Sequence, residues 1–288
     1  MLSEKALLVR LSVKYPSFSK TDKGVSLEVA DQKNANQRAV KVIKTLIDTT
    51  HPAYKAVKTA RGALYNVFAA ETAPWSEDGW YIIKAKGYDR FTEVMREKTD
   101  AFDIAVADFL KVYPELVDQA PHRLGDLFDA DIFPSVEACA ELFHSDVEVR
   151  PVPEAGDFRV AMSAEDKQKI VTQMQRKNDE RVTQVTSECF DRAYSAISNM
   201  VERLEAFDPD KKGAKLYDSL VGNVRDIADL LPSLNVGDDP RLEQLAKDIG
   251  LRLTETDAST LKKDEGKRQE VADNARQIMN QIDDFIGQ

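Results

Sequence analysis

Alternating apolar and polar residues open the chain. Between residues 6 and 13, Val9, Leu11 and Val13 are separated by single polar residues. A spacing of two places these side chains on one face of an extended segment, so the pattern predicts a strand with one buried face. A single strand leaves its backbone groups unpaired, and this segment therefore needs partners elsewhere in the chain.

Two later segments are the best candidates for those partners. Residues 147–152 and 157–162 interleave apolar and charged side chains, and a four-residue link that ends in Gly156 joins them. A short link of this kind is typical of a hairpin. The sequence therefore predicts a three-stranded antiparallel sheet made of residues 6–13, 147–152 and 157–162.

Between these strands the apolar residues recur at spacings of three and four, the period of an amphipathic helix. One helix is predicted over residues 27–48, and a second begins at Pro52, because proline suits the first helical turn. The same period runs over residues 88–113 until Pro114 interrupts it. A shorter helix is predicted over residues 116–128.

The longest helix is predicted to begin at Ser163, where Ser163 and Asp166 have the spacing of a capping box. Its apolar residues form a seam over residues 182–204, which predicts packing against another helix or self-association into a homo-oligomer. Helices over residues 216–231 and 257–286 are the expected internal partners. The seam comprises Val182, Val185, Cys189, Ala193, Ile197, Met200 and Leu204.

These patterns together predict a mostly α, α+β fold. A small three-stranded antiparallel sheet flanked by helices is followed by a long helical hairpin or bundle with coiled-coil character. We expect two domains, one over residues 1–162 with the sheet and one over residues 163–288 with the long helices.

Charge and composition narrow the possible partners. The chain of 288 residues has 40 basic and 50 acidic residues and a net charge of −10, so its overall field repels nucleic acid and anionic membranes. No apolar run is long enough to span a membrane, and Glu4, Lys5 and Arg10 interrupt the first segment. We expect a soluble protein of the cytoplasm, with Cys139 and Cys189 as reduced core residues.

Motifs of catalysis and of metal or cofactor binding do not emerge. The sequence has no glycine-rich phosphate loop, no nucleophile elbow and no dinucleotide fingerprint. Its histidines, His51, His122 and His144, do not have the close spacing of metal ligands. We therefore predict no catalytic residues, no metal, no cofactor and a function other than that of an enzyme.

The most unusual stretch is residues 70–91, in which both tryptophans, a proline and an Asp-Gly pair fall within seven residues. One interpretation is a structural corner, in which the tryptophans fill the wedge between two helices. The other is a docking site, because rigid aromatic residues are good interface anchors. The predicted partner-binding residues are Trp75, Asp78, Gly79 and Trp80, with Gly156, Asp157 and Arg159 of the predicted hairpin.

A basic stripe beside aromatic residues suggests an alternative, a single-stranded nucleic-acid-binding protein. Two cations share a face of the first predicted helix, three share a face of the next, and three follow the loop that contains the tryptophans. The overall charge argues against this alternative. The stripe comprises Lys41, Lys44, Lys55, Lys58, Arg61, Lys84, Lys86 and Arg90.

Several motifs carry a resemblance to a known family. The segments LLVRLSV near the N-terminus, APWSEDG (73–79), YPELV (113–117) and PVPEAGDFRV (151–160), with a longer stretch over 219–245, resemble a phage and prophage family known only as a domain of unknown function. The similarity covers nearly the whole chain. The segment YPSFSKTDKG (15–24) takes the place of a tryptophan-containing segment found in many relatives.

The resemblance implies a phage-encoded protein that works in the host cytoplasm. Genes of such families often lie near those of MoxR-like AAA+ ATPases and von Willebrand A-domain proteins. It therefore implies a non-catalytic, partner-binding adaptor subunit whose protein partner is one of these. A virion or scaffolding component is a further alternative.

Overall fold

The computed structural model describes residues 2–76, 78–153, 163–209, 211 and 215–286. Residue contacts divide the chain into two compact units. Unit 1 comprises Met1–Arg10, Ala69–Phe91 and Val149–Gln288, and unit 2 comprises Leu11–Phe68 and Thr92–Glu148. The expected domains, residues 1–162 and 163–288, stay a prediction, because a unit defined by contacts need not fold independently.

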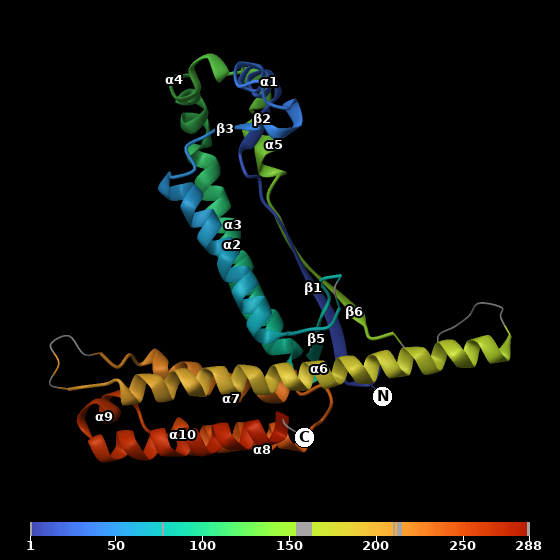
Figure 1. The fold of residues 1–288 in the computed structure, drawn as a ribbon, viewed down its shortest axis with the longest axis vertical. Coiled ribbons are helices and arrows are strands. Elements are labelled where there is room, and N and C mark those ends of the chain that lie inside the picture. Colours follow the sequence, from blue (N-terminus) through green and yellow to red (C-terminus); the bar gives the residue numbers. More distant parts are fainter. Residues whose placement is uncertain (1, 77, 154–162, 210, 212–214, 287–288) are drawn as a thin grey trace. The chain divides into compact units, whose positions relative to one another are not determined.

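The predicted class, mostly helical with a small antiparallel sheet, is confirmed (Figure 1). Among the described residues, no helix combines the length and the apolar character that a membrane span requires. The strands are β1 (Ala6–Lys14), β2 (Ser19–Asp22), β3 (Val42–Thr45), β4 (Ala73–Pro74), β5 (Tyr81–Lys84) and β6 (His144–Pro151). The α-helices are α1 (Lys23–Gln32), α2 (Pro52–Glu71), α3 (Tyr88–Asp118), α4 (Ala120–Leu124), α5 (Val136–Ala140), α6 (Ala164–Glu205), α7 (Ser219–Leu234), α8 (Pro240–Leu253), α9 (Ala258–Lys263) and α10 (Glu265–Ile286).

The predicted three-stranded sheet is wrong. The strands predicted over residues 6–13 and 147–152 are present as neighbours, β1 and β6, but the described residues form a four-stranded sheet of order β4-β5-β1-β6 and a separate β2-β3 pair. β5 pairs antiparallel with β1, with Leu8 opposite Ile82. The predicted strand over 157–162 lies outside the described residues. The sequence pattern missed β5 because its four residues follow the tryptophan turn directly and are too few to show a period.

The predicted helix over residues 27–48 is also wrong beyond its first turns. α1 ends at Gln32, and Asn34 takes a left-handed backbone with φ of 50° that a continuing helix does not allow. The following residues form β3, in which Ile43 lies opposite Thr21 of β2. Pairing between β2 and β3 therefore overrides the helical spacing of the apolar residues, and β-branched side chains suit the strand better.

Proline does not interrupt α3 where the sequence predicted. α3 continues through Pro114 to Asp118, and the predicted helix over 116–128 is reduced to the short α4. A proline within a helix costs one backbone hydrogen bond and introduces a kink. Burial of Tyr113 and Leu116, on either side of the proline, offsets that cost.

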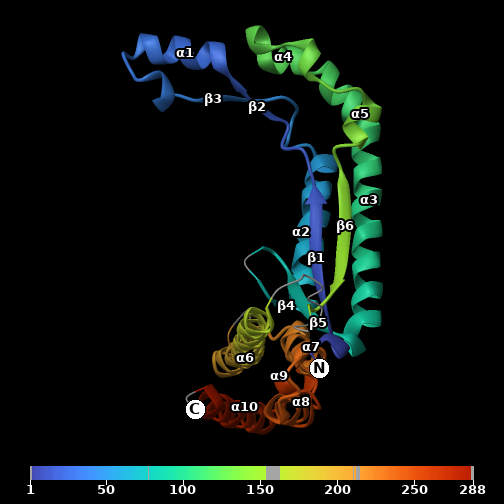
Figure 2. The same ribbon diagram turned by 90° about the vertical axis from the view of Figure 1, so that its right-hand side faces the viewer.

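Unit 2 has an aromatic core. α2 and α3 lie side by side (Figure 1, Figure 2), and Tyr54 of α2 lies 5.5 Å from Phe109 of α3 between ring centroids. Phe18 contacts both rings at 5.6 Å, and the Tyr113 hydroxyl donates a hydrogen bond to the Pro134 carbonyl at 3.0 Å. Tilted and edge-to-face aromatic pairs of this kind stabilise a core beyond the area they bury.

Unit 1 is organised around α6. Ser163 caps this helix as predicted, since its hydroxyl oxygen accepts a hydrogen bond from the Asp166 backbone N–H at 3.1 Å. The predicted seam packs against α7 and α10 of the same chain, and Val185 to Leu204 of the seam are buried (Figure 1). The first half of α6, residues 164–184, contains no buried residue. The predicted helix over 257–286 breaks at Asp264 into α9 and α10.

An acidic clasp joins the loop between α7 and α8 to the sheet strands of unit 1. Asp238 forms salt bridges with both Lys5 and Lys84. Its backbone is left-handed, with a φ of 53°. Hydrogen bonds from Lys5 and Lys84 lower the pKa of Asp238 to about 2. The clasp therefore remains charged at all but strongly acidic pH.

The seam of α6 generates a first prediction. Ile197 is fully buried, so Ile197→Ala removes apolar contacts and leaves a cavity. We expect it to lower the free energy of unfolding by about 2–5 kcal/mol. Urea unfolding followed by far-UV circular dichroism measures this change. The matched control is Ile104→Ala at a residue 64% exposed, which should change stability by less than about 0.5 kcal/mol; equal effects would contradict the packing described for α6.

The acidic clasp generates a second prediction. A carboxyl with a lowered pKa stabilises the fold above its unfolded pKa of about 3.9, and that contribution disappears as pH falls through the folded value. Asp238→Asn, which retains a side chain tolerant of left-handed backbone, should cost less than about 1 kcal/mol near neutral pH, because the carboxylate is partly exposed. The difference from the wild type should shrink below about pH 4.

Urea unfolding over a pH series measures the difference for Asp238→Asn. The control is Asp229→Asn, since Asp229 is exposed and forms no ion pair with any residue the structure describes. A stability difference for Asp238→Asn that is constant down to about pH 2 would show that the charge of the clasp is not its source.

Candidate functional site

The tryptophan stretch folds as a hairpin between β4 and β5. Trp75 and Ser76 both donate backbone hydrogen bonds to the Trp80 carbonyl, at 2.9 and 3.1 Å, and the Gly79 N–H donates to the Ser76 carbonyl at 3.2 Å. Gly79 has a φ of 81°, a left-handed conformation that favours glycine. The stretch is therefore a tight strand turn, and the interpretation as a corner between two helices needs this correction.

Both tryptophan rings are buried. Trp75 is 5% exposed and Trp80 is 8% exposed, and both belong to the apolar core that β1, β5 and the helices α6–α10 build. Their burial favours the structural role for the rings themselves. A partner that docks here meets the groups that surround the rings.

Arginines cover the faces of the tryptophans. The guanidinium carbons of Arg10 and Arg150 lie 4.8 and 4.5 Å from the centroid of the Trp80 ring, and that of Arg181 lies 5.4 Å from the Trp75 ring. A guanidinium within about 6 Å of an aromatic face is attracted by the negative charge of that face. Three cationic side chains therefore lie against the two rings.

A recess of about 280 Å³ opens beside these rings, and we call it the tryptophan recess. Its apolar side comprises Leu8, Trp75, Trp80 and Met174, and its rim includes prolines, Ser76 and Asn178. Among the lining residues that the structure describes, three are cationic and only Asp78 is acidic. The cations are Arg150, Lys177 and Arg181. A locally positive recess thus lies on a chain whose net charge is −10.

The structure describes some of the predicted partner-binding residues and not others. Asp78 is exposed and lines the recess, and Gly79 is exposed in the turn beside it. Pro151 and Pro153, at the start of the predicted hairpin, also line the recess. Gly156, Asp157 and Arg159 lie outside the described residues.

The basic stripe of the nucleic-acid alternative is largely engaged within the chain. Lys41 and Lys44 do not share a helix face, because residues 42–45 form β3, and the Lys44 ammonium lies 3.1 Å from the Asp22 carboxylate. Lys84 is held by Asp238, and Arg90 lies 3.3 Å from Glu71. The Arg61 guanidinium carbon lies over the rings of Tyr15 and Tyr65, 5.3 and 5.0 Å from their centroids. Lys55, Lys58 and Arg61 do share α2 at helical spacing, as predicted.

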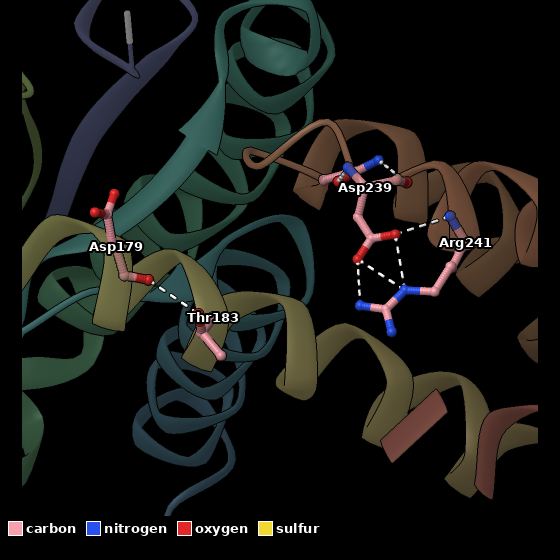
Figure 3. Close-up of polar contacts among 5 residues, drawn as sticks. Asp179, Thr183, Asp239 and Arg241 are labelled. Atoms are coloured by element: carbon pink, nitrogen blue, oxygen red, sulfur yellow. Dashed lines mark hydrogen bonds and ion pairs between the residues drawn. The ribbon is translucent and has the colours of Figure 1, made fainter. Parts of the chain in front are cut away.

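A second recess, of about 430 Å³, lies between α6 and the loop before α8, but most of its polar side chains already have partners. Figure 3 shows the Asp239 carboxylate facing Arg241, which donates from its backbone N–H at 2.8 Å and from guanidinium Nη2 at 2.7 Å. The Thr183 hydroxyl donates to the Asp179 carbonyl of its own helix at 3.0 Å. The second recess therefore offers a ligand fewer free hydrogen-bonding groups than the tryptophan recess does.

Burial makes the two cysteines poor candidates for chemistry. It raises the pKa of the Cys139 thiol to about 11 and that of Cys189 to about 12. Both thiols are therefore protonated at neutral pH, whereas the thiolate is the reactive form. In the part of the chain that the structure describes, no three His, Cys, Asp or Glu side chains gather as metal ligands would.

Comparison with protein-family models, with curated proteins and with solved structures finds no match to this chain.

Four cations of the site were missed at the sequence level. Arg10 and Arg150 lie on β1 and β6, and Lys177 and Arg181 lie one turn apart on α6. The spacing of four between Lys177 and Arg181 places them on one face of a helix, which is the single signal the sequence offered. Their meeting with the tryptophans depends on contacts between segments far apart in the sequence.

The buried rings generate a third prediction. Trp75→Ala should lower the free energy of unfolding by about 3–5 kcal/mol, because it empties a filled core position. Urea unfolding followed by far-UV circular dichroism measures the loss. Lys177→Ala is the control on the rim of the same recess, and we expect a change within about 0.5 kcal/mol. Full stability of Trp75→Ala would show that the ring is not part of the core.

Proposed function

We propose that this chain is a non-catalytic adaptor subunit that binds a protein partner at the tryptophan recess. The observation that carries the proposal is the gathering of Arg150, Lys177 and Arg181 beside buried aromatic rings, on a chain of net charge −10. Arginine and tryptophan are enriched among the residues that dominate interface energetics. Anchored aromatic rings also keep the cations ordered before binding, which lowers the entropic cost of association.

The two motifs that carry much of the family resemblance meet at this recess. The APWSEDG segment supplies the tryptophan turn, and the PVPEAGDFRV segment begins with Pro151 and Pro153 on the rim. Residues that serve only a helical bundle have no need to gather at an open recess. This coincidence supports the view that the resemblance reflects a shared docking surface.

The partner in this proposal is a MoxR-like AAA+ ATPase or a von Willebrand A-domain protein, and the chain is a phage-encoded component of an ATPase-driven remodelling assembly in the host cytoplasm. The resemblance supplies the identity of the partner. The recess is where we expect this partner to dock.

A quantitative pull-down tests the proposal. The tagged full chain is used as bait in phage-infected cells, with and without a slowly hydrolysed ATP analogue and with nuclease treatment. We expect nucleotide-dependent recovery of the ATPase or the von Willebrand A-domain protein. We also expect Lys177→Glu to reduce recovery several-fold, since it reverses an exposed charge at the rim.

Lys167→Glu is the matched control for the pull-down. Lys167 is also exposed on α6, about three turns before Lys177, and it does not line the recess. Recovery that disappears with nuclease would favour the nucleic-acid alternative, and recovery of capsid proteins alone would favour a virion or scaffolding component. Equal recovery with both variants would place the docking site elsewhere.

A further inference from the structure

We propose that the tryptophan recess binds a short acidic segment of a partner polypeptide, with one apolar side chain of that segment inserted beside Leu8 and Met174. This inference rests on the partner-binding function proposed above and names the chemistry of the occupant.

The cations of the recess complement the charge of an acidic segment. Lys177 and Arg181 form no ion pair with any acidic residue of the described chain, although acidic residues outnumber basic ones in the sequence. The Arg181 guanidinium carbon lies over the Trp75 ring, 5.4 Å from its centroid. Its N–H groups form no hydrogen bond with the residues that the structure describes, so they can donate to a carboxylate of a partner. A chain of net charge −10 repels an acidic segment over most of its surface, so a cationic recess also fixes where such a segment docks.

The volume of the recess limits what enters it. At about 280 Å³ it lies just below the range of about 300–1,000 Å³ that is typical of cofactor and small-molecule pockets. Its inner wall is apolar, with Leu8, Trp75 and Trp80 all less than a tenth exposed. A single apolar side chain of a peptide suits this space, while the flanking carboxylates remain at the cationic rim.

The state of the rings favours a peptide over a nucleic acid. Single-stranded nucleic acids bind by stacking bases on open aromatic faces. Here guanidinium groups lie over the faces of both tryptophans, at 4.5–5.4 Å from the ring centroids. Lys177 and Arg181 remain available to anions at the recess, but the rings are not open platforms for bases.

Intrinsic fluorescence makes the site directly observable, because Trp75 and Trp80 are the two tryptophans of the sequence and both line the recess. The probe is an acidic octapeptide of aspartate and glutamate around one leucine, titrated into the full chain. We expect a saturable change in tryptophan fluorescence that weakens as salt is raised. A neutral peptide, with asparagine and glutamine in place of the acids, should produce no saturable change.

Variants separate specific docking from general attraction. Lys177→Glu should weaken peptide affinity roughly tenfold, equivalent to about 1.4 kcal/mol, and Lys167→Glu should leave it within about twofold. Replacing the leucine of the peptide by glycine should also weaken binding. Affinity that is equal for the two variants, or a neutral peptide that binds as well as the acidic one, overturns the inference.

Two further experiments test other occupants of the recess, a nucleic acid and a second copy of the chain. A thymidine oligonucleotide of matched charge that binds as tightly as the peptide, with the same sensitivity to Lys177→Glu, would make the recess a general polyanion site. Sedimentation of the chain alone tests a second copy as the occupant, and self-association abolished by Lys177→Glu would overturn the peptide inference. If the pull-down recovers its partner but the acidic peptide does not bind, the peptide inference fails and the adaptor function stands. If the acidic peptide binds but the pull-down recovers no partner, the adaptor function fails and the peptide inference stands.

Discussion

The burial of one stripe of α6 is the interaction on which unit 1 depends. The eight buried residues of this helix all lie between Val185 and Leu204, where α7 and α10 cover them. Each buried aliphatic side chain contributes roughly 1.5–3 kcal/mol, whereas an ion pair along a helix surface contributes about 0.2–0.5 kcal/mol. Packing therefore holds the second half of α6 in place, and surface charge pairs such as Glu188 with Arg192 add little by comparison.

The first half of the same helix has a different role. No residue over 164–184 is buried, and the helix is supported there by the Ser163 cap and by pairs such as Glu165 with Lys169 at 2.7 Å. Because the rigid second half fixes its direction, this part can present Lys177 and Arg181 at a defined place beside the β4-β5 hairpin. One helix thus joins the core of unit 1 to its candidate docking site.

The two tryptophans lie beneath arginine side chains. Both rings are less than a tenth exposed, and the guanidinium groups of three arginines lie over their faces. Ordering these long side chains before binding removes part of the entropic cost of association. The recess is therefore positively charged on a chain whose net charge is negative, and such a local change in the sign of the charge favours a specific docking position over non-specific binding.

The sequence by itself determined the features that depend on local patterns. The alternating residues of β1, the cap at Ser163, the seam of α6 and the burial of both cysteines follow from spacing and residue type, and the structure confirms them. Prediction from the sequence failed where pairing between segments of the chain decides the secondary structure. The helix predicted over 27–48 is an example, because part of it forms the β2-β3 pair instead. Pro114 and Pro232 likewise lie inside helices, because burial of the neighbouring residues outweighs a lost backbone hydrogen bond.

Only the tertiary structure decided the candidate site. A sequence shows that tryptophans and cations are present, but their meeting requires β1, the β4-β5 hairpin, the end of β6 and α6 to converge from positions more than 160 residues apart. No local periodicity records such a convergence, because it depends on which buried faces pair with one another. For this reason the sequence drew attention to the turn at Trp75–Trp80, but only the structure shows that both rings are buried and that Arg150, Lys177 and Arg181 line the recess beside them.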